Sequence, residues 1–190
     1  ELISRFYQNT EKIQENQPTA IIDLKDGIRR INQLIADNAK GCESSLGTKV
    51  GFAKIDNSGG LHKSDLIVVA GESSHGKTSL ATSMVVNAVH NGSRVAFYSM
   101  EMTDIQIMAR TMAIESGVNA NHILHSNLTP DEQRKIDITF GSLEGIDGNF
   151  FIDDRSTSSI DTIISSIKTL KKRKNIDGAV IDYLQILNVN

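Results

Sequence analysis

The residues whose types and spacing most clearly suit a chemical purpose lie at positions 71–78, which read Gly-Glu-Ser-Ser-His-Gly-Lys-Thr. This stretch matches the pattern G-x-x-x-x-G-K-[ST] of a phosphate-binding loop. Glycine lets such a loop curl until its backbone N–H groups converge on phosphate oxygens. Lys77 would add positive charge beside the β and γ phosphates, and Thr78 offers a hydroxyl group to Mg²⁺.

The flanking residues support the same interpretation. An apolar run at 66–70 directly precedes the loop and a helical pattern directly follows it, so the positive end of that helix would point at the phosphates. The alternative, a glycine-rich turn with an exposed lysine, does not account for these flanks. We interpret His75 as a variable loop position rather than a catalyst. The sequence thus predicts a site for ATP and Mg²⁺ that includes Gly71, Glu72, Ser73, Ser74, His75, Gly76, Lys77, Thr78 and Ser79.

Phosphoryl transfer also needs a carboxylate near Mg²⁺ and a group that orients water. Asp182 ends an apolar strand pattern, and the carboxyl ends of parallel strands form the edge where ligands bind. It is our candidate for the Mg²⁺ side, against the alternative of an aspartate that only caps a strand. Glu101 also follows a strand pattern and is a candidate for polarising the attacking water. Asp153 and Asp154 compete for that role, and spacing alone does not choose between them.

Strand and helix patterns alternate along the part of the chain that must position these residues. Strands are predicted at 66–70, 94–99, 150–153 and 179–184, and helices at 77–90, 103–117, from 129 onward, and 160–170. The strand at 66–70 has no polar alternation, which is typical of a parallel strand covered on both faces. The order predicts an α/β fold with a mostly parallel central sheet flanked by helices.

Two of the predicted helices carry clear start signals. Thr103 with Gln106, and Thr129 with Glu132, have the spacing of a capping box. In the first of these helices we expect a buried face made of Ile105, Met108, Ala109 and Met112.

The N-terminal part of the chain is expected to be separate. Residues 21–37 carry an apolar seam at alternating spacings of three and four, which predicts an amphipathic helix, and residues 42–47 resemble a linker. We therefore divide the chain into a helical linker segment at 1–46 and the N-terminal part of an ATPase domain at 47–190.

Composition limits the class of protein. The 190 residues have a net charge of −3 and are 39% hydrophobic, so the chain can form a core but is not a polycation. With Cys42 as the only cysteine, no internal disulfide is possible, and a reducing cytoplasm is the expected compartment. No apolar run is long enough to cross a membrane and no signal-peptide pattern is present. The chain starts with Glu1, so we expect it to be part of a longer protein.

A run of four basic residues occupies positions 171–174. It could contact a DNA backbone. The simpler explanation, which we favour from sequence, is that cations stabilise the C-terminus of a helix.

Several motifs together resemble one family. The stretches 50–56 and 59–66, followed by the loop, resemble the start of the RecA-like motor domain of DnaB-type replicative DNA helicases. Residues 97–102 resemble the family's element with the catalytic glutamate, and residues 180–185 resemble its Walker B strand. The motifs occur in the family's order from about position 50 to the end of the chain.

The resemblance implies roles for individual residues. Lys77 and Thr78 would bind phosphate and Mg²⁺, Asp182 would belong to the Mg²⁺ shell, and Glu101 rather than Asp153 would activate water. Arg110 resembles a family arginine near the nucleotide base. The helix at 21–37 resembles the linker helix that docks on a neighbouring subunit, with packing on its own domain as the alternative.

For the whole protein the resemblance implies a hexameric ring that hydrolyses ATP between subunits, translocates on single-stranded DNA and unwinds duplex. It also implies a primase and a helicase loader as partners. The family's sensor strand, central DNA-binding loops and arginine finger would follow position 190, so this chain alone should hydrolyse ATP poorly. Glu72 and His75 depart from the cellular enzymes, which favours a phage or mobile-element relative. The alternatives are a RadA-like or KaiC-like ATPase that is not a helicase, or a nucleotide-sensing interaction module.

Overall fold

The computed structural model of the protein describes residues 22–39, 47–63, 65–72, 74–155 and 159–182. Cys42, Ser73 and the residues after Asp182 that resemble the Walker B strand lie outside this part. The chain divides into two compact units, Glu1–Ser45 and Leu46–Asn190. No helix within the described ranges is long and apolar enough to cross a membrane.

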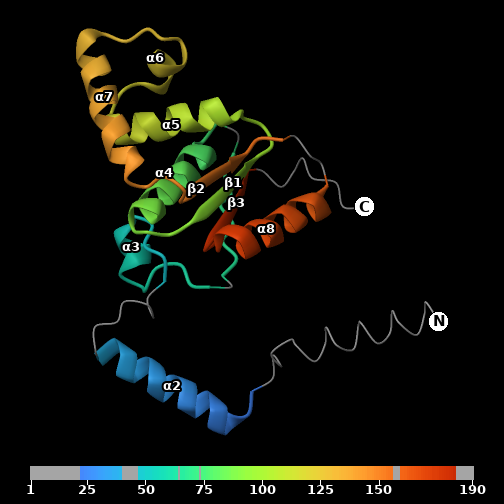
Figure 1. The fold of residues 1–190 in the computed structure, drawn as a ribbon. Coiled ribbons are helices and arrows are strands. Elements are labelled where there is room, and N and C mark those ends of the chain that lie inside the picture. The colour runs from blue at the N-terminus through green and yellow to red at the C-terminus, as the bar shows by residue number, and fades with distance from the viewer. Residues whose placement is uncertain (1–21, 40–46, 64, 73, 156–158, 183–190) are drawn as a thin grey trace, which may run out of the picture. The chain divides into compact units, whose positions relative to one another are not determined.

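The second unit is an alternation of helices and strands (Figure 1). Its elements in chain order are α3 (Ala53–Asp56), α4 (Lys77–His90), β1 (Val95–Ser99), α5 (Asp104–Ser116), α6 (Ala120–Leu124), α7 (Pro130–Glu144), β2 (Phe150–Asp153), α8 (Ile160–Lys174) and β3 (Gly178–Asp182). The predicted α/β fold class is therefore confirmed. The short helix α6 has no counterpart among the elements expected from sequence.

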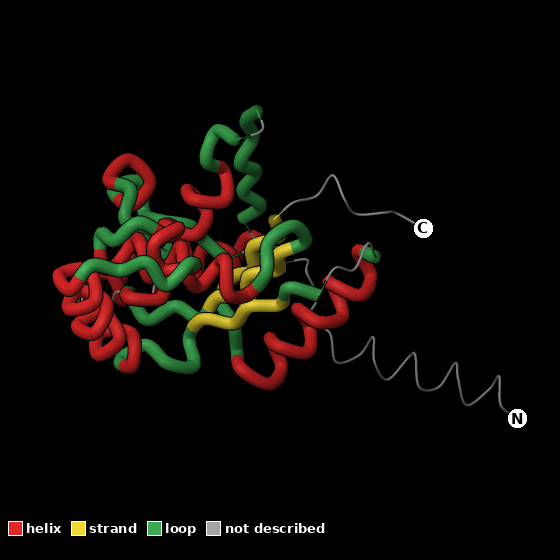
Figure 2. Tube along the Cα trace, turned by 90° about the horizontal axis from the view of Figure 1, so that it is seen from above, coloured by secondary structure: helices red, strands yellow, loops and turns green. Residues whose placement is uncertain are grey.

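Strand β1 is the centre of a parallel sheet with the order β2-β1-β3. All five of its residues are buried, as its apolar composition predicts. The register places Tyr98 opposite Asp153 on β2 and Ser99 opposite Asp182 on β3. Because the strands are parallel, their carboxyl ends meet at one edge of the sheet. Figure 2 shows the three strands side by side with helices around them.

Helices cover the two faces of this sheet. Val95 and Phe97 of β1 pack with Val85 and Val89 of α4, in a cluster that also includes Ile107 of α5. The alternate residues of β1 point the other way, to a cluster on α8 that contains Ala96, Tyr98 and Ile163. The period of two along the strand thus divides the core into two layers.

Helices α5, α6 and α7 form a third cluster, centred on Met112, Val118 and Ile136. Both predicted capping boxes are present: the Thr103 hydroxyl accepts from the backbone N–H group of Gln106, and Thr129 and Glu132 form the same arrangement at α7. These caps were predictable because each involves residues three apart.

The start of the second unit is held against α4 by hydrogen bonds. The Asp56 carboxylate accepts hydrogen bonds from the backbone N–H groups of Val50 at 2.8 Å and Gly51 at 2.9 Å, and Asn87 of α4 donates to the Val50 carbonyl at 3.1 Å. Gly60 adopts φ +78, and a Cβ atom there would lie 2.6 Å from the carbonyl oxygen of Thr48. Only glycine fits this close approach.

Two expectations from the sequence are wrong in this structure. Residues 66–70 do not form a buried strand: Leu66 is 90% and Val68 is 69% exposed, and the segment does not pair with any of the described strands. A buried parallel strand needs a hydrogen-bonding neighbour and cover on both faces, and the described residues give this segment neither. On α5, Ala109 and Met112 are buried as expected, but Ile105 and Met108 are exposed because they line an open groove.

The first unit contains α2 (Leu24–Ala39), which confirms the helix predicted at 21–37 with a later start. Its apolar seam is largely exposed, with Leu24 at 81% and Ile35 at 60%. An amphipathic helix in water normally buries such a seam against another surface.

The α7 cap generates a prediction about pH. Backbone hydrogen bonding from Thr129, followed by the hydrogen bond with His122, lowers the pKa of Glu132 from its ordinary value of 4.5 to about 2. A lowered pKa in the folded state adds stability above the unfolded pKa, and this stability is lost as pH falls toward the folded pKa. We expect Glu132→Gln to lower the thermal midpoint at pH 7.

The difference between wild type and Glu132→Gln should shrink between pH 4.5 and pH 2, measured by circular dichroism melts. Asp137→Asn, at an exposed position on the same helix, serves as the control for loss of one carboxylate. A constant difference across this pH range would contradict the assigned role of Glu132.

Candidate phosphate-binding site

The loop before α4 has the backbone conformation that an anion site requires. Gly76, at the N-cap position of α4, has φ 81 and ψ 20, and Ser74 also has a positive φ of 63. Among the residues that the structure describes, no side chain caps the first turn of this helix. Its leading N–H groups are therefore available to an anion at the positive end of the helix dipole.

The Lys77 ammonium group lies over this loop. It donates hydrogen bonds to the carbonyl oxygens of Gly71 at 2.9 Å and Glu72 at 2.8 Å. Carbonyl dipoles hold the cation in place, and a phosphate placed at the α4 N-terminus would meet it there. His75 lies 3.9 Å from the Glu72 carboxylate at an exposed position, which fits a variable loop residue better than a catalyst.

The hydroxyl group of Thr78 donates a hydrogen bond of 2.6 Å to the Asp182 carboxylate, across 104 residues of sequence. The two side chains are partly buried. This contact joins the phosphate-binding loop to the carboxyl end of β3. It brings together the two residues that the sequence analysis assigned to Mg²⁺.

The two oxygens suit a small divalent cation. Magnesium ligands lie at 2.0–2.1 Å in octahedral geometry, so adjacent ligand oxygens are roughly 2.9 Å apart. The Thr78 and Asp182 oxygens, at 2.6 Å, are close to that separation. The described residues contain no group of three or more acidic, histidine or cysteine side chains that could hold a metal by themselves. A cation here would therefore take its other ligands from phosphate and water.

Glu101 lies at the same edge of the sheet. The Met100 N–H group donates to the Asp182 carbonyl at 2.8 Å, so Glu101 follows directly on a backbone contact with the β3 end. The Ser99 hydroxyl accepts from the Met102 N–H group at 3.1 Å and fixes the turn that carries Glu101. The Glu101 side chain is exposed and forms no hydrogen bond or ion pair with the residues that the structure describes.

The two competing aspartates have other partners. The Asp153 carboxylate accepts a hydrogen bond from the Arg155 guanidinium group. This bond holds the pKa of Asp153 below its ordinary value. The Asp154 carboxylate accepts the Asp104 N–H group at 3.1 Å at the first turn of α5. Of the three acidic candidates, Glu101 is thus the one whose carboxylate is not engaged by a described residue.

Arg110 reaches the same region from α5. Its guanidinium group donates to the Ser79 hydroxyl at 2.8 Å, in the first turn of α4. Sequence reasoning missed the contribution of Ser99, whose hydroxyl orders the turn before Glu101. The only sequence signal was its place at the end of a strand pattern.

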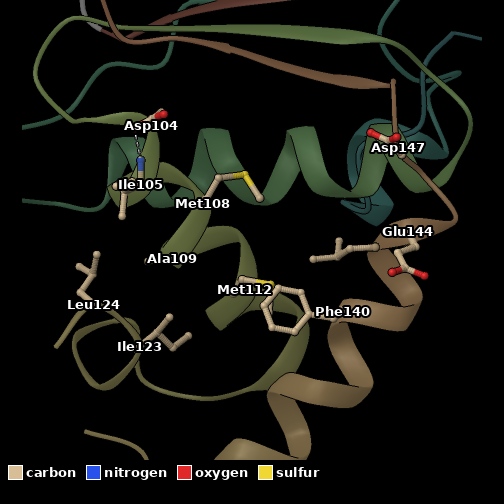
Figure 3. Close-up of a pocket in the computed structure, with 11 residues that line it drawn as sticks. Asp104, Ile105, Met108, Ala109, Met112, Ile123, Leu124, Phe140, Glu144 and Asp147 are labelled. Carbon is tan, nitrogen blue, oxygen red and sulfur yellow. Dashed lines mark hydrogen bonds between the residues drawn. The ribbon is translucent and has the colours of Figure 1, made fainter. Parts of the chain in front are cut away.

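A second feature lies apart from this site. Helices α5, α6 and α7 enclose a groove of about 700 Å³ with an apolar floor and an acidic rim (Figure 3). The floor includes Ile105, Met108, Met112, Ile123, Leu124 and Phe140, and the rim includes Asp104, Glu144 and Asp147. Phe140 is 56% and Ile105 is 67% exposed. We call this feature the α5–α7 groove.

A parallel sheet with an aspartate at a strand end bonded to the phosphate-binding loop defines a P-loop domain, and its likeness to a solved ATPase domain makes it RecA-like. Comparison with known proteins narrows this class. The family model described as the DnaB-like helicase C-terminal domain matches residues 47–190, so the chain belongs to that family.

Two curated relatives are similar over part of their length. The replicative DNA helicase DnaB of Geobacillus stearothermophilus is 33% identical over 143 residues, which cover 74% of this chain and 31% of the relative. The replicative DNA helicase DnaC of Bacillus subtilis is 30% identical over 182 residues, 95% of this chain and 38% of the relative. The chain thus spans about a third of the length of these relatives.

Solved structures agree on the fold. One solved ATPase domain superposes with a TM-score of 0.68 and 25% identity, covering 83% of this chain and 58% of its own. A DnaB-like replicative helicase, solved in a study of its interactions with primase, superposes with a TM-score of 0.70 over 100% of this chain and 46% of its own. Its identity of 21% makes it a likeness of fold alone.

The partners of the competing aspartates lead to a prediction. Asp154→Ala should destabilise the chain by about 1 kcal/mol because α5 loses an acceptor for its first N–H group. Urea titration followed by circular dichroism would measure this loss. Asp131→Ala is the matched control on the exposed first turn of α7. If Asp154→Ala leaves the unfolding midpoint unchanged, the contact with Asp104 does not stabilise α5.

Proposed function

We propose that this chain is part of the ATP-hydrolysing motor of a replicative DNA helicase, in which it binds ATP and Mg²⁺ at the α4 N-terminus. The observation that carries the proposal is the 2.6 Å contact between Thr78 and Asp182. Family membership over residues 47–190 supports the choice of a helicase among RecA-like ATPases. Residues 1–46 are proposed as a helical linker segment, and 47–190 as the N-terminal part of the ATPase domain.

The backbone N–H groups of the loop and of the first turn of α4 bind the phosphates. Lys77 exchanges its carbonyl partners for the β and γ phosphates when nucleotide binds. Thr78 and Asp182 would hold Mg²⁺, which would supply positive charge to the phosphates. Arg110 donates a hydrogen bond to Ser79 and so positions it beside the nucleotide.

Glu101 is the proposed positioning group for water. Its place beyond the β1–β3 contact puts a carboxylate at the edge of the sheet where the γ phosphate would lie. The carboxylate is not engaged by a described residue, so it can accept a hydrogen bond from the attacking water. The carboxylates of Asp153 and Asp154 are already engaged by Arg155 and by α5.

The motor is proposed to act as a homo-oligomeric ring, a hexamer, on single-stranded DNA, with a primase and a helicase loader as partners. The primase partner is supported by one structure of similar fold, a DnaB-like replicative helicase whose interactions with primase were studied. The proposed compartment is the cytoplasm of a bacterium or of a phage-infected cell. Strand displacement by the whole protein separates this function from that of a RecA-like ATPase that is not a helicase.

Two exposed apolar surfaces support the proposal that the protein forms a ring. The α2 seam and the α5–α7 groove both expose apolar side chains that water disfavours. Lys25 and Arg30 flank the seam of α2, and the groove has an acidic rim. We propose that α2 of one copy lies in the α5–α7 groove of the next copy.

Glu101→Gln should keep ATP binding and lower ATP turnover by roughly 10²- to 10⁴-fold, the usual contribution of a positioned acid or base. The measurements are equilibrium binding of a fluorescent ATP analogue and phosphate release by the whole protein. Lys77→Ala is the contrasting variant, with nucleotide affinity reduced by about 100-fold because a charged hydrogen-bond donor is lost. Turnover by Glu101→Gln at the wild-type rate would exclude Glu101 as the water-positioning group.

Ile31→Glu should dissociate the ring, because it would place a carboxylate in an apolar contact, with association weakened by roughly 100-fold or more. Gln33→Glu adds the same charge on the opposite side of α2 and should leave the ring intact. Light scattering during size-exclusion chromatography measures the mass. If both variants keep the wild-type mass, α2 does not hold neighbouring copies together. Dissociation by Met108→Glu would identify the groove as the receiving surface.

A further inference from the structure

The C-terminal end of α8 carries more cationic side chains than bond to its terminal carbonyl groups. Lys171, Lys172, Arg173 and Lys174 form its last turn, Lys168 lies one turn earlier, and all of them are exposed. Cations at a helix C-terminus normally serve its unpaired carbonyl groups. On sequence alone this explanation covered the whole run.

In the structure, two cations already serve that end of the helix. Lys171 donates to the carbonyl oxygen of Ile176 at 2.8 Å, and Arg94 donates to that of Lys174 at 3.1 Å. The carboxylate of Asp177, which follows the helix, accepts the Arg94 backbone N–H group at 2.9 Å. The Lys174 carbonyl at the helix end, the Ile176 carbonyl just beyond it and the Asp177 carboxylate therefore have partners that do not include Lys168, Lys172 or Arg173.

Three of the other cations, Lys168, Lys172 and Arg173, are exposed within the last two turns of α8, and we call them the α8 cationic end. Their side chains form no hydrogen bond or ion pair with residues that the structure describes. Lys168 and Lys172 are four positions apart on one helix face, where like charges destabilise a helix. An anionic partner would relieve this repulsion.

The composition of the surface limits what that partner can be. Between positions 168 and 174 the only large apolar residue is Leu170, which is partly buried against the α8 core cluster. Protein partners are usually anchored by aromatic or apolar residues in pockets, and bases of nucleic acids stack on aromatic rings. The α8 cationic end offers neither, but it offers charged donors for phosphates, which bind without regard to sequence.

We propose that the α8 cationic end binds the phosphate backbone of DNA, at a surface apart from the nucleotide site. The choice of DNA among polyanions rests on the proposed helicase function. The helix end packs at the start of β1, where the Asp177 N–H group donates to the Arg94 carbonyl at 2.7 Å. Thr78, Asp182 and Glu101 lie at the other end of the strands, because Asp182 is the last residue of β3 and Met100 bonds to it. DNA held there would lie outside the ATP site.

The test compares DNA binding by the whole protein and by the variant Lys168→Gln/Lys172→Gln/Arg173→Gln, without nucleotide, by fluorescence anisotropy on a labelled forked duplex. Each lost phosphate contact removes about 0.7–0.9 from the slope of log K against log salt concentration. We expect the slope to fall by about 2 to 3 and the affinity at 0.1 M salt to fall roughly 10- to 100-fold. ATP turnover without DNA should stay unchanged.

Two controls separate a specific surface from net charge and from misfolding. Lys54→Gln/Arg134→Gln/Lys135→Gln removes the same charge from exposed positions elsewhere and should change affinity by less than about twofold. Lys168→Arg/Lys172→Arg keeps the charge and should bind like wild type. If the triple glutamine variant fails to fold, the single variants Lys172→Gln and Arg173→Gln should each reduce the slope by about one contact.

An unchanged affinity and slope in the glutamine variants would overturn the proposal, as would an equal loss in the charge-matched control. The proposal would also be overturned if the triple glutamine variant lost binding to an acidic protein but kept its affinity for DNA. This result can be told apart from a failure of the proposed helicase function. In that case the wild-type protein would show no strand displacement, while the triple glutamine variant would still lose DNA affinity.

Discussion

The hydrogen bond between Thr78 and Asp182 is the contact on which the candidate site depends, because it joins residues that are 104 positions apart. Neither residue could hold a cation with the other if α4 and β3 were placed differently. The position of Asp182 is fixed by the pairing of β3 with β1, in which Ser99 lies opposite it. The position of Thr78 is fixed by α4, whose Val85 and Val89 pack on the same strand. Burial of β1 on both faces therefore determines the geometry of the phosphate-binding site.

The same strand also explains where the third chemical group lies. Hydrogen bonding between β1 and β3 continues to Met100, and the chain then turns under the control of the Ser99 hydroxyl. Glu101 follows at the edge where parallel strands present their carboxyl ends. Asp153 lies at the corresponding end of β2, but Arg155 engages its carboxylate. Proximity to the sheet edge is thus shared by several acids, and only the local partners distinguish them.

Outside the core, the chain exposes surfaces that favour association. The seam of α2 and the α5–α7 groove are apolar, and the last turns of α8 carry unpaired positive charge although the chain has a net charge of −3. Apolar area in water and uncompensated like charge both raise the free energy of an isolated chain. Under the two proposals, a second copy would cover the apolar surfaces and phosphate would neutralise the charge.

By itself the sequence determined the features that depend on neighbouring residues. The pattern at 71–78 and the caps at Thr103 and Thr129 were predictable because their contacts span only a few positions. Only the tertiary structure decided that residues 66–70 lack strand partners and that Met108 lines a groove. The tertiary structure also decided that Asp153 bonds to Arg155 and that Glu101 stays exposed. An apolar or acidic residue has the same local pattern whether its distant neighbours cover it or not, and those neighbours are set by packing across the whole unit.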